Sequence, residues 1–357
     1  MTPFYGGITK IPPRFLFLGG KKMSKLYTVA VLGATGAVGQ EMIKILEERD
    51  FPVGKLVPLA SARSAGKTLK YRGEDVTIQL ACDEAFEGVD IVLGAAENDI
   101  AERFAPAIVK AGAVFVDNSS AFRLDPNVPL IVPEVNPQDV KNHKGILSNP
   151  NCSTIITVTA VNALNSIAPI RAMTTSTYQA VSGAGAAGPK ELMAEVEALR
   201  VGETYEPKVF SHQIAYNLIP QIGGEQCDGY TSEEMKMQNE GRKIMHLPEL
   251  TVSCTCVRVP VIRSHSISAS IRFDRPVSVA QAREVIAKAP GCKLVDDLGA
   301  KQYPMPLDTS GQDIVYVGRI RPDLTDPNGI CLWCCGDQVR KGAATNCIQI
   351  AELLIEK

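Results

Sequence analysis

The chain has 357 residues, of which 45% are hydrophobic and 21% are charged. That length accommodates two domains of ordinary size, and the composition is typical of folded globular proteins and excludes a globally disordered chain. The 37 basic and 39 acidic residues give a net charge of −2, so we expect no nucleic-acid partner, and no apolar run reaches the length of about 18 residues that a membrane span requires.

Residues 1–24 precede the first convincing strand, and we predict that they form an N-terminal extension. Their apolar patch, Phe15–Leu18, is shorter than the apolar core of about 7–15 residues in a signal peptide. The ten cysteines are scattered along a long chain, which is typical of reduced thiols in the cytosol. We therefore expect a cytoplasmic protein.

Short apolar runs alternate with amphipathic stretches of helix length over residues 25–150, a pattern typical of βαβ units in a parallel sheet. The first helical stretch carries Val38, Met42, Ile45 and Leu46 at helical spacing. We predict an α/β fold in which this region is a Rossmann-like dinucleotide-binding domain. Its expected strands are Thr28–Leu32, Lys55–Leu59, Ile91–Leu93, Val114–Val116, Leu130–Val132 and Gly145–Leu147.

The first expected strand runs directly into the sequence GATGAVG at residues 33–39, which then opens a helix. Glycines spaced G-x-x-G-x-x-G allow a tight turn and a close approach of the backbone to a pyrophosphate, whose charge the helix N-terminus stabilises. An ordinary glycine-rich turn is the alternative, but the order of strand, glycines and helix favours a dinucleotide site. The predicted cofactor contacts in this loop are Gly33, Thr35, Gly36, Ala37, Val38 and Gly39.

No acidic residue follows the second expected strand, where an NAD enzyme usually places one to bind the ribose 2′-hydroxyl. The strand is followed instead by Ser61, Arg63 and Ser64. A guanidinium and two hydroxyls suit a 2′-phosphate, so we predict NADP as the cofactor. A solvated loop position for Arg63 is the alternative.

Beyond residue 150 the pattern changes to one helix, expected over Thr154–Ile167, followed by strands that alternate with period two. Thr251–Val259 and Ser264–Phe273 are such strands. We predict a second, α+β catalytic and dimerisation domain over residues 151–336, whose sheet has one face exposed or in an interface. The last segment, about residues 337–357, has a helical pattern and is expected to return to the first domain.

The segment SNPNCST at residues 148–154 links a strand end to an apolar helix and places Cys152 at the helix N-terminus. There the helix dipole stabilises a thiolate and lowers the pKa of the thiol. Most cysteines are small buried apolar residues, and Cys152 differs from the others by its position. After a nucleotide-binding domain, such a thiol indicates covalent acyl chemistry coupled to hydride transfer.

The chain resembles the aspartate-β-semialdehyde dehydrogenase family from about Lys25 to the C-terminus, in blocks that follow the family's order. Two segments depart from the family pattern: Leu93–Asn98 replaces a loop of small residues, and Ser264 replaces a glycine that often precedes the histidine. The matching blocks are Gly33–Gly39, Ser61–Gly66, Asp117–Arg123, Asn149–Thr154, Gln179–Gly185, Glu233–Lys236, Arg258–Ser266 and Lys341–Asn346.

The resemblance implies the reduction of L-aspartyl-4-phosphate to L-aspartate-4-semialdehyde with NADPH through a cysteine thioester, in lysine, diaminopimelate, methionine and threonine synthesis, by a homodimer or homotetramer. Such chemistry needs a thiol of low pKa and a proton carrier near neutrality. By the resemblance, Cys152 is the nucleophile, Gln179 orients the acyl group, His265 is acid and base, Arg258 binds the substrate carboxylate, Glu233 holds the substrate amine, Lys236, Arg123 and Asn118 bind phosphate, and Ser182, Gly183 and Asn346 contact the cofactor.

Several alternatives stay open. Taken alone, His265 is a core histidine on an apolar strand face. N-acetyl-glutamyl-phosphate reductase shares the architecture and the thiol chemistry, whereas a non-catalytic NADP-sensing regulator explains the glycine loop but gives Cys152 no role. Cys331–Cys335 contains the C-x-x-C spacing of a zinc half-site, but no second half completes it. We therefore expect no metal.

Overall fold

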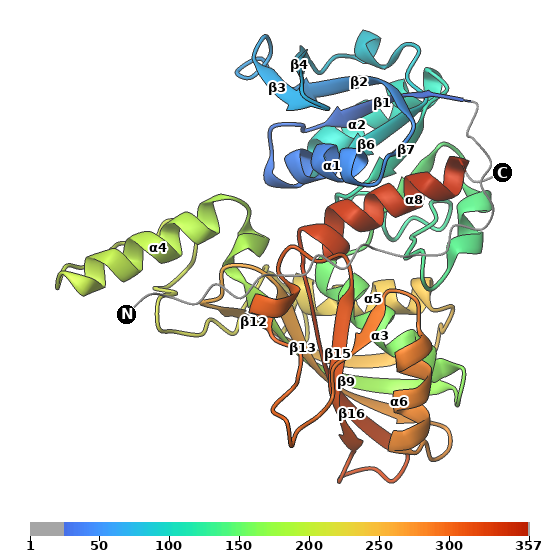
Figure 1. Ribbon diagram of the computed structural model, residues 1–357, viewed down its shortest axis with the longest axis vertical. Coiled ribbons are helices and arrows are strands. Elements are labelled where there is room, and N and C mark those ends of the chain that lie inside the picture. Colours follow the sequence, from blue (N-terminus) through green and yellow to red (C-terminus); the bar gives the residue numbers. More distant parts are fainter. Residues whose placement is uncertain (1–24, 356–357) are drawn as a thin grey trace.

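A computed structural model describes residues 25–355 of the chain, so the predicted extension at residues 1–24 lies outside the described residues. Two six-stranded sheets lie one above the other in Figure 1, the first built from the N-terminal part of the chain and the second from residues 170–336. The first sheet is parallel and the second is mixed. The predicted fold class, a Rossmann-like sheet joined to an α+β unit, is confirmed.

The first sheet consists, in spatial order, of β5 (Gln79–Leu80), β2 (Val53–Ala60), β1 (Tyr27–Leu32), β6 (Ile91–Gly94), β7 (Val114–Asp117) and β8 (Ile146–Ser148), and it packs with the helices α1 (Ala37–Glu48), α2 (Asn98–Lys110) and α8 (Thr345–Ile355). Side chains of β1 alternate between the two faces. Val29 and Val31 pack with α1 and α8, whereas Ala30 and Leu32 pack with α2. The carboxyl ends of the parallel strands therefore meet at one edge, between the two sheets (Figure 1).

The predicted strand Leu130–Val132 is wrong. Leu130 pairs with Ser148 only as an isolated bridge, and the N–H of Ile131 donates to Ser148 O at 3.1 Å. A parallel ladder draws its donors from alternate residues, and the residues two positions before and after Ile131 are Pro129 and Pro133, which have no N–H. This segment therefore donates only one backbone hydrogen bond to β8 and does not form a strand.

The second sheet consists, in spatial order, of β12 (Thr251–Val259), β9 (Ile170–Ala180), β13 (His265–Phe273), β16 (Gly329–Gly336), β15 (Val315–Pro322) and β14 (Cys292–Leu294). The helices α3 (Cys152–Asn165), α5 (Ser232–Ile244) and α6 (Val279–Lys288) share one apolar core with this sheet. The other face of the sheet carries half-buried side chains, among them Ser176, Tyr178, Ser268 and Trp333. The sequence-based expectation of one less covered sheet face agrees with this arrangement.

The C-terminal segment returns from the second sheet to the first. Strand β16 leads into a π-helical turn, η4 (Arg340–Ala344), and then into α8, whose apolar side chains lie in the core of the first sheet. Helix α4 (Ala187–Arg200) extends away from both sheets (Figure 1). The remaining elements are β3 (Thr68–Tyr71), β4 (Glu74–Thr77), η1 (Asp83–Phe86), η2 (Pro137–Asn142), η3 (Val181–Ala184), β10 (Glu225–Cys227), β11 (Tyr230–Thr231) and α7 (Pro306–Thr309).

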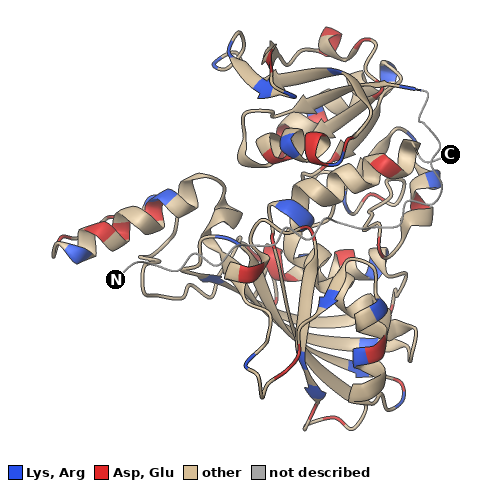
Figure 2. Cartoon of the chain, in the orientation of Figure 1, with Lys and Arg blue, Asp and Glu red and all other residues tan. Residues whose placement is uncertain are grey.

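Basic and acidic residues are interspersed along the chain, on helices, strands and loops (Figure 2). Within residues 25–355, no helix combines the length and the apolar character needed to cross a membrane.

Candidate active site

Cys152 is the first residue of α3, where the chain leaves the carboxyl end of β8. Asn151 caps this helix, because its Oδ1 accepts hydrogen bonds from the N–H groups of Ser153 (3.1 Å) and Thr154 (3.2 Å). The helix begins two residues before the predicted Thr154, since the asparagine side chain satisfies donors that have no partner in the first turn. The cap holds Cys152 in a defined position, partly exposed.

Helix α5 brings a carboxylate to the loop that carries the nucleophile. Glu233 Oε1 accepts hydrogen bonds from Asn151 Nδ2 (2.9 Å) and Gln179 Nε2 (3.2 Å). Its Oε2 accepts one from Lys236 Nζ (2.9 Å). Burial by itself raises the pKa of this carboxyl, but the charge of Lys236 and the hydrogen bonds outweigh burial and lower the pKa to about 2. Glu233 is therefore ionised, and it joins Lys236, Gln179 and the loop that carries Cys152.

The thiol of Cys152 is not acidified in this structure. Its pKa is raised to about 12, first by burial and then by the negative charge of Glu233, against the lowering effect of Lys236, Arg123 and Arg258. The predicted lowering of the thiol pKa by the helix N-terminus is therefore wrong for this structure. Burial is the largest cause, and it outweighs the positive charges of Lys236, Arg123 and Arg258 near the thiol.

Arg258 and His265 lie on the strands to either side of β9 and meet at η3. Arg258 pairs in register with Gln179, and its Nη1 donates to the backbone oxygen of Ala180 at 2.7 Å. A β-carbon built on Gly183 would lie 2.7 Å from Arg258 Nη1 and 3.3 Å from His265 Nε2. Both side chains therefore approach the loop that was predicted to contact the cofactor.

His265 is fully buried, and its ring is held in one tautomer. The N–H of Ala180 donates to Nδ1 at 3.1 Å, so the ring proton lies on Nε2. Among the described residues Nε2 has no hydrogen-bond partner. Burial, followed by the positive charge of Arg258, lowers the pKa of His265 to about 3. The expectation of a pKa near neutrality is wrong for this structure, which presents a neutral imidazole with one free N–H.

The predicted phosphate-binding residues lie beside the nucleophile loop. Arg123 Nε donates to Asn149 O at 3.0 Å, and its Nη2 donates to Asn118 O at 2.9 Å. Asn149 Nδ2 in turn donates to the side-chain oxygen of Asn118 at 2.7 Å. These bonds tie the loop after β7 to the segment that precedes Cys152.

Asn346 lies close to this loop. The residue is fully buried, and its Nδ2 donates to Asn149 Oδ1 (2.7 Å) and to Ile131 O (3.0 Å). Lys341 Nζ donates to its Oδ1 at 3.0 Å. Because both ends of the amide have protein partners, this geometry gives Asn346 a supporting role in the loop. The cofactor contact that the resemblance implies stays a prediction.

The glycine loop forms a cradle that larger residues would fill. Gly33 has a φ of +86°, and a β-carbon there would lie 2.5 Å from the carbonyl oxygen of Ala95. A β-carbon on Gly39 would lie 2.3 Å from Gly33 O. Helix α1 follows with Gly36 at its N-cap, where no side chain occupies the backbone donors. Free N–H groups at a helix N-terminus suit a pyrophosphate, so the loop fits a dinucleotide.

A cavity of about 530 Å³ lies between α1 and the loops of the second sheet. Its lining includes Ala37 of the glycine loop, Ser182 of η3, and Ile262. The structure therefore brings two predicted cofactor residues to one groove. Arg63 is exposed, on the turn of residues 61–66 that follows β2.

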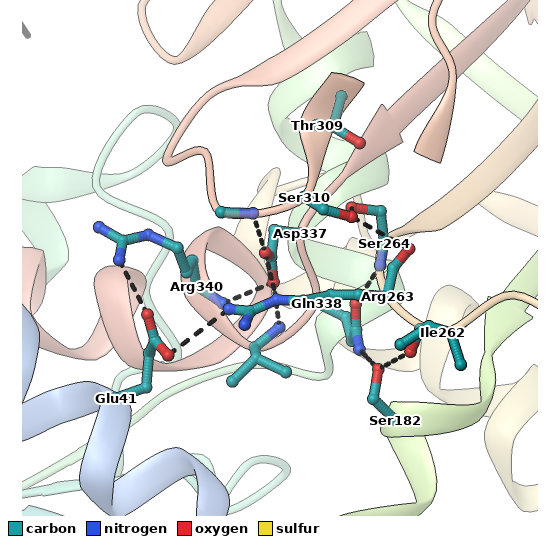
Figure 3. A network of polar contacts seen from close by, with 12 residues as sticks. Glu41, Ser182, Ile262, Arg263, Ser264, Thr309, Ser310, Asp337, Gln338 and Arg340 are labelled. Atoms are coloured by element: carbon teal, nitrogen blue, oxygen red, sulfur yellow. Dashed lines mark hydrogen bonds and ion pairs between the residues drawn. The ribbon is translucent and has the colours of Figure 1, made fainter. Parts of the chain in front are cut away.

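A polar network borders this groove and connects it to the strand of His265 (Figure 3). Gln338 Oε1 accepts a hydrogen bond from the N–H of Ser264 at 2.8 Å, and Gln338 Nε2 donates to Ser182 Oγ. Ser264 has a φ of +76°, which explains both the glycine common at this position and the start of β13 at His265 rather than Ser264. A non-glycine residue in this conformation costs about 1–3 kcal/mol, and the network holds it there.

Two arginines join α1 to the second sheet beside the same groove (Figure 3). Arg340 Nη1 donates to Glu41 Oε1 at 2.8 Å, and Arg263 Nε donates to Asp337 Oδ2 at 2.6 Å. Arg263 also lies 3.5 Å from Glu41 Oε2. These ion pairs set the position of the helix that follows the glycine loop relative to η3.

The sequence reasoning missed several buried polar residues around the site, above all Glu240 of α5. Glu240 stands two helical turns after Glu233, a spacing that places both on one helix face and could have revealed it. Within the described part of the chain, no group of three or more His, Cys, Asp or Glu residues is arranged to hold a metal ion. Cys331 and Cys334 lie on strand β16, where side chains three residues apart point to opposite faces.

Two family models match most of the chain. Residues 28–143 match the NAD-binding domain of semialdehyde dehydrogenases, and residues 161–341 match their dimerisation domain. A parallel sheet with a glycine cradle, joined to a second domain that carries a thiol at a helix N-terminus, thus defines a nucleotide-binding dehydrogenase of the semialdehyde class.

Comparison with individual relatives identifies the family within this class. An aspartate-semialdehyde dehydrogenase from Synechocystis sp. is 49% identical over 329 residues, which cover 92% of this chain and 97% of the relative. The crystal structure of aspartate semialdehyde dehydrogenase II from Vibrio cholerae complexed with ASA matches with a TM-score of 0.90 and 42% identity, covering 93% of this chain and 99% of that one. The structure of the Candida albicans enzyme with NADP matches with a TM-score of 0.71 and 28% identity, covering 92% of this chain and 98% of that one. The chain belongs to the aspartate-semialdehyde dehydrogenase family, which confirms the resemblance.

Proposed function

We propose that this protein reduces L-aspartyl-4-phosphate to L-aspartate-4-semialdehyde and inorganic phosphate with NADPH, through a thioester on Cys152. The observation that carries the proposal is the convergence around one thiol: Glu233 contacts both Gln179 and the cap of the Cys152 helix. The product would serve lysine, diaminopimelate, methionine and threonine synthesis.

In the first half of the reaction, the Cys152 thiolate attacks the acyl carbon, the bond to phosphate breaks, and a thioester forms. Lys236 and Arg123 supply positive charge for the departing phosphate. Because the charge of Glu233 raises the pKa of the thiol, a substrate ammonium bound to Glu233 would remove part of that effect and favour the thiolate.

In the second half, a bound nicotinamide supplies the hydride that reduces the thioester. The resulting adduct on Cys152 carries negative charge on its oxygen, and it collapses to the aldehyde and the thiolate. We assign His265 a role at this oxygen, because its free Nε2–H is a buried donor within the site and would hydrogen-bond to the charged oxygen. The acid and base role that the resemblance implies stays a prediction, since a neutral imidazole must first gain a proton before it can donate one. Gln179 orients the acyl group.

We propose NADP rather than NAD as the cofactor. The exposed Arg63, with Ser61 and Ser64 on the same turn, offers a guanidinium and two hydroxyls to a 2′-phosphate. The related Candida albicans structure, described with NADP, supports this assignment. The groove that includes Ala37 and Ser182 leads from the glycine loop to η3, beside His265.

The charges of the site favour aspartyl phosphate over N-acetyl-glutamyl phosphate. Arg258 would bind the α-carboxylate and Glu233 the free α-ammonium. An acetamide against Glu233 would leave this buried carboxylate without its counter-charge, which is costly.

We further propose that the protein is a homodimer or a homotetramer. The second sheet matches a dimerisation domain, and its open face carries Tyr178 and Trp333, whose ring centroids are 5.3 Å apart. Light scattering coupled to size-exclusion chromatography measures the oligomeric state.

The test of the function is phosphate-dependent reduction of NADP with aspartate semialdehyde as the substrate. We expect turnover that requires phosphate and that is faster than with N-acetyl-glutamate semialdehyde. A better rate with the acetylated substrate would refute the aspartate assignment, and NADP binding without turnover of either aldehyde would favour a regulator.

A further inference from the structure

Glu240 is a buried carboxylate of α5 that the proposed mechanism does not use. It lies two turns beyond Glu233 on the same helix face and is only 2% exposed. Its Oε1 accepts a hydrogen bond from Arg123 Nη1 at 3.1 Å, and its Oε2 accepts one from the backbone N–H of Asn151 at 2.7 Å. One side chain thus contacts both the arginine expected to bind phosphate and the residue before Cys152.

The bond to Glu240 uses one of the donors of the Arg123 guanidinium. A guanidinium has five N–H donors in a fixed plane. Three of them are used by Glu240 and by the backbone oxygens of Asn149 and Asn118. The other two, one on each terminal nitrogen, have no partner among residues 25–355, and they are the donors left for an oxyanion.

Helix α5 also holds the main chain around the same arginine. Lys243, one turn after Glu240, donates from Nζ to the backbone oxygens of Arg123 (2.8 Å), Asp125 (2.7 Å) and Val128 (2.7 Å). Helix α5 therefore contacts Arg123 both at its backbone, through Lys243, and at its guanidinium, through Glu240. Glu240 also connects Arg123 to Asn151, the cap of the Cys152 helix.

We propose that Glu240 is a positioning residue that sets the Arg123 guanidinium at a fixed place relative to Cys152. One substrate can then place its phosphoryl group against Arg123 while its acyl carbon lies against the Cys152 sulfur. This inference rests on the proposed role of Arg123 in phosphate binding. A purely electrostatic role predicts the opposite result on mutation, because a carboxylate paired with Arg123 weakens its attraction for an anion.

E240Q separates these two roles. Both partners of Glu240 are donors, and an amide offers one acceptor oxygen, so one donor would face an NH₂ group. In the direction that consumes phosphate, NADP and aspartate semialdehyde, we expect the KM for phosphate to rise by about tenfold to a hundredfold, with the KM for NADP unchanged. An unchanged or lower KM for phosphate would overturn the proposal.

E234Q is the matched control. Like Glu240, Glu234 is a buried carboxylate of this helix that accepts two hydrogen bonds, but both come from backbone N–H groups, those of Thr231 (2.7 Å) and Cys256 (2.9 Å). We expect this variant to lose stability without a change in the KM for phosphate. An equal rise in both variants would show that Glu240 acts only through the stability of α5 and would overturn the proposal.

Two further variants complete the test. E240D keeps the charge, but its shorter side chain cannot span both donors, so we expect a raised KM for phosphate here too; a wild-type value overturns the proposal, and this variant decides if E240Q does not fold. R123K separates the proposed role of Arg123 from the proposed role of Glu240. An unchanged KM for phosphate in R123K removes the proposed role of Arg123, whereas a rise in R123K without one in E240Q removes the role of Glu240 alone.

Discussion

Gly342 lies directly against Cys152: a β-carbon built on Gly342 would stand 3.0 Å from Cys152 Cβ and 3.3 Å from its Cα. Gly342 belongs to the π-helical turn η4, which connects the second sheet to the helix that packs on the first. The return of the chain to the nucleotide-binding sheet therefore passes behind the nucleophile.

Gly342→Ala should displace the nucleophile. The added methyl group overlaps the Cys152 backbone, so we expect kcat to fall by about tenfold to a hundredfold and the free energy of unfolding to fall by about 1–3 kcal/mol. Steady-state kinetics and urea denaturation measure the two effects. Gly224→Ala is the control, because a β-carbon there meets no atom within 4 Å. A wild-type kcat in Gly342→Ala would show that the contact relaxes without moving the thiol.

Cys152→Ala should abolish turnover and leave the affinity for NADPH nearly unchanged, since the covalent step is lost while the glycine loop is untouched. Fluorescence titration with NADPH and the phosphate-dependent assay measure the two properties. Substantial activity in the purified variant is incompatible with Cys152 as the nucleophile.

Arg63→Ala should weaken the binding of NADPH more than that of NADH, because only NADPH carries the 2′-phosphate. We expect a loss of about 1–3 kcal/mol for NADPH, the range of hydrogen bonds to charged groups. Lys70→Ala is the control, since Lys70 is exposed and pairs with Asp75 at 3.0 Å. Equal losses for both cofactors would mean that Arg63 supports the turn and not the phosphate.

Glu233→Gln should lower the pKa of the Cys152 thiol, because it removes the second-largest cause of the rise to about 12. We expect faster alkylation by iodoacetamide at neutral pH than in the wild type, with the rate in Cys152→Ala subtracted to remove the other cysteines. If alkylation is slower or unchanged, the charge of Glu233 does not raise the pKa of the thiol.

His265→Asn should flatten the dependence of stability on pH. The folded protein holds His265 with a pKa of about 3 against an ordinary value of 6.5, so the unfolded chain binds more protons in this interval, and stability falls as the pH falls through it. The loss is at most about 1.4 kcal/mol per pH unit. Glu233, with a pKa of about 2 against an ordinary 4.5, destabilises in the same direction at lower pH.

Urea denaturation of His265→Asn and the wild type between pH 4.5 and 6.5 isolates the histidine, because Glu233 stays largely ionised in both folded proteins there. The difference in unfolding free energy between the two proteins should change with pH. A constant difference would contradict a buried neutral imidazole.

Features that depend on neighbouring residues could be predicted from the amino-acid sequence: the glycine loop between a strand and a helix, the thiol at a helix N-terminus, and the alternation of the second sheet. Pro129 and Pro133 also argue against a strand at residues 130–132, because a β-ladder needs N–H donors that proline lacks. The positive φ of Ser264 was not legible from the serine itself, since its conformation depends on the bond from its N–H to Gln338.

The charge states of the site and the hydrogen bonds that support its residues arise from the packing of distant elements. The pKa of a thiol or an imidazole depends on how far packing removes it from water, and elements distant in the chain bury His265 fully and Cys152 in part. The partners of Glu240 likewise come from two separate loops. Local sequence specifies helices and strands, but desolvation and hydrogen bonding across the fold arise only when those elements pack together.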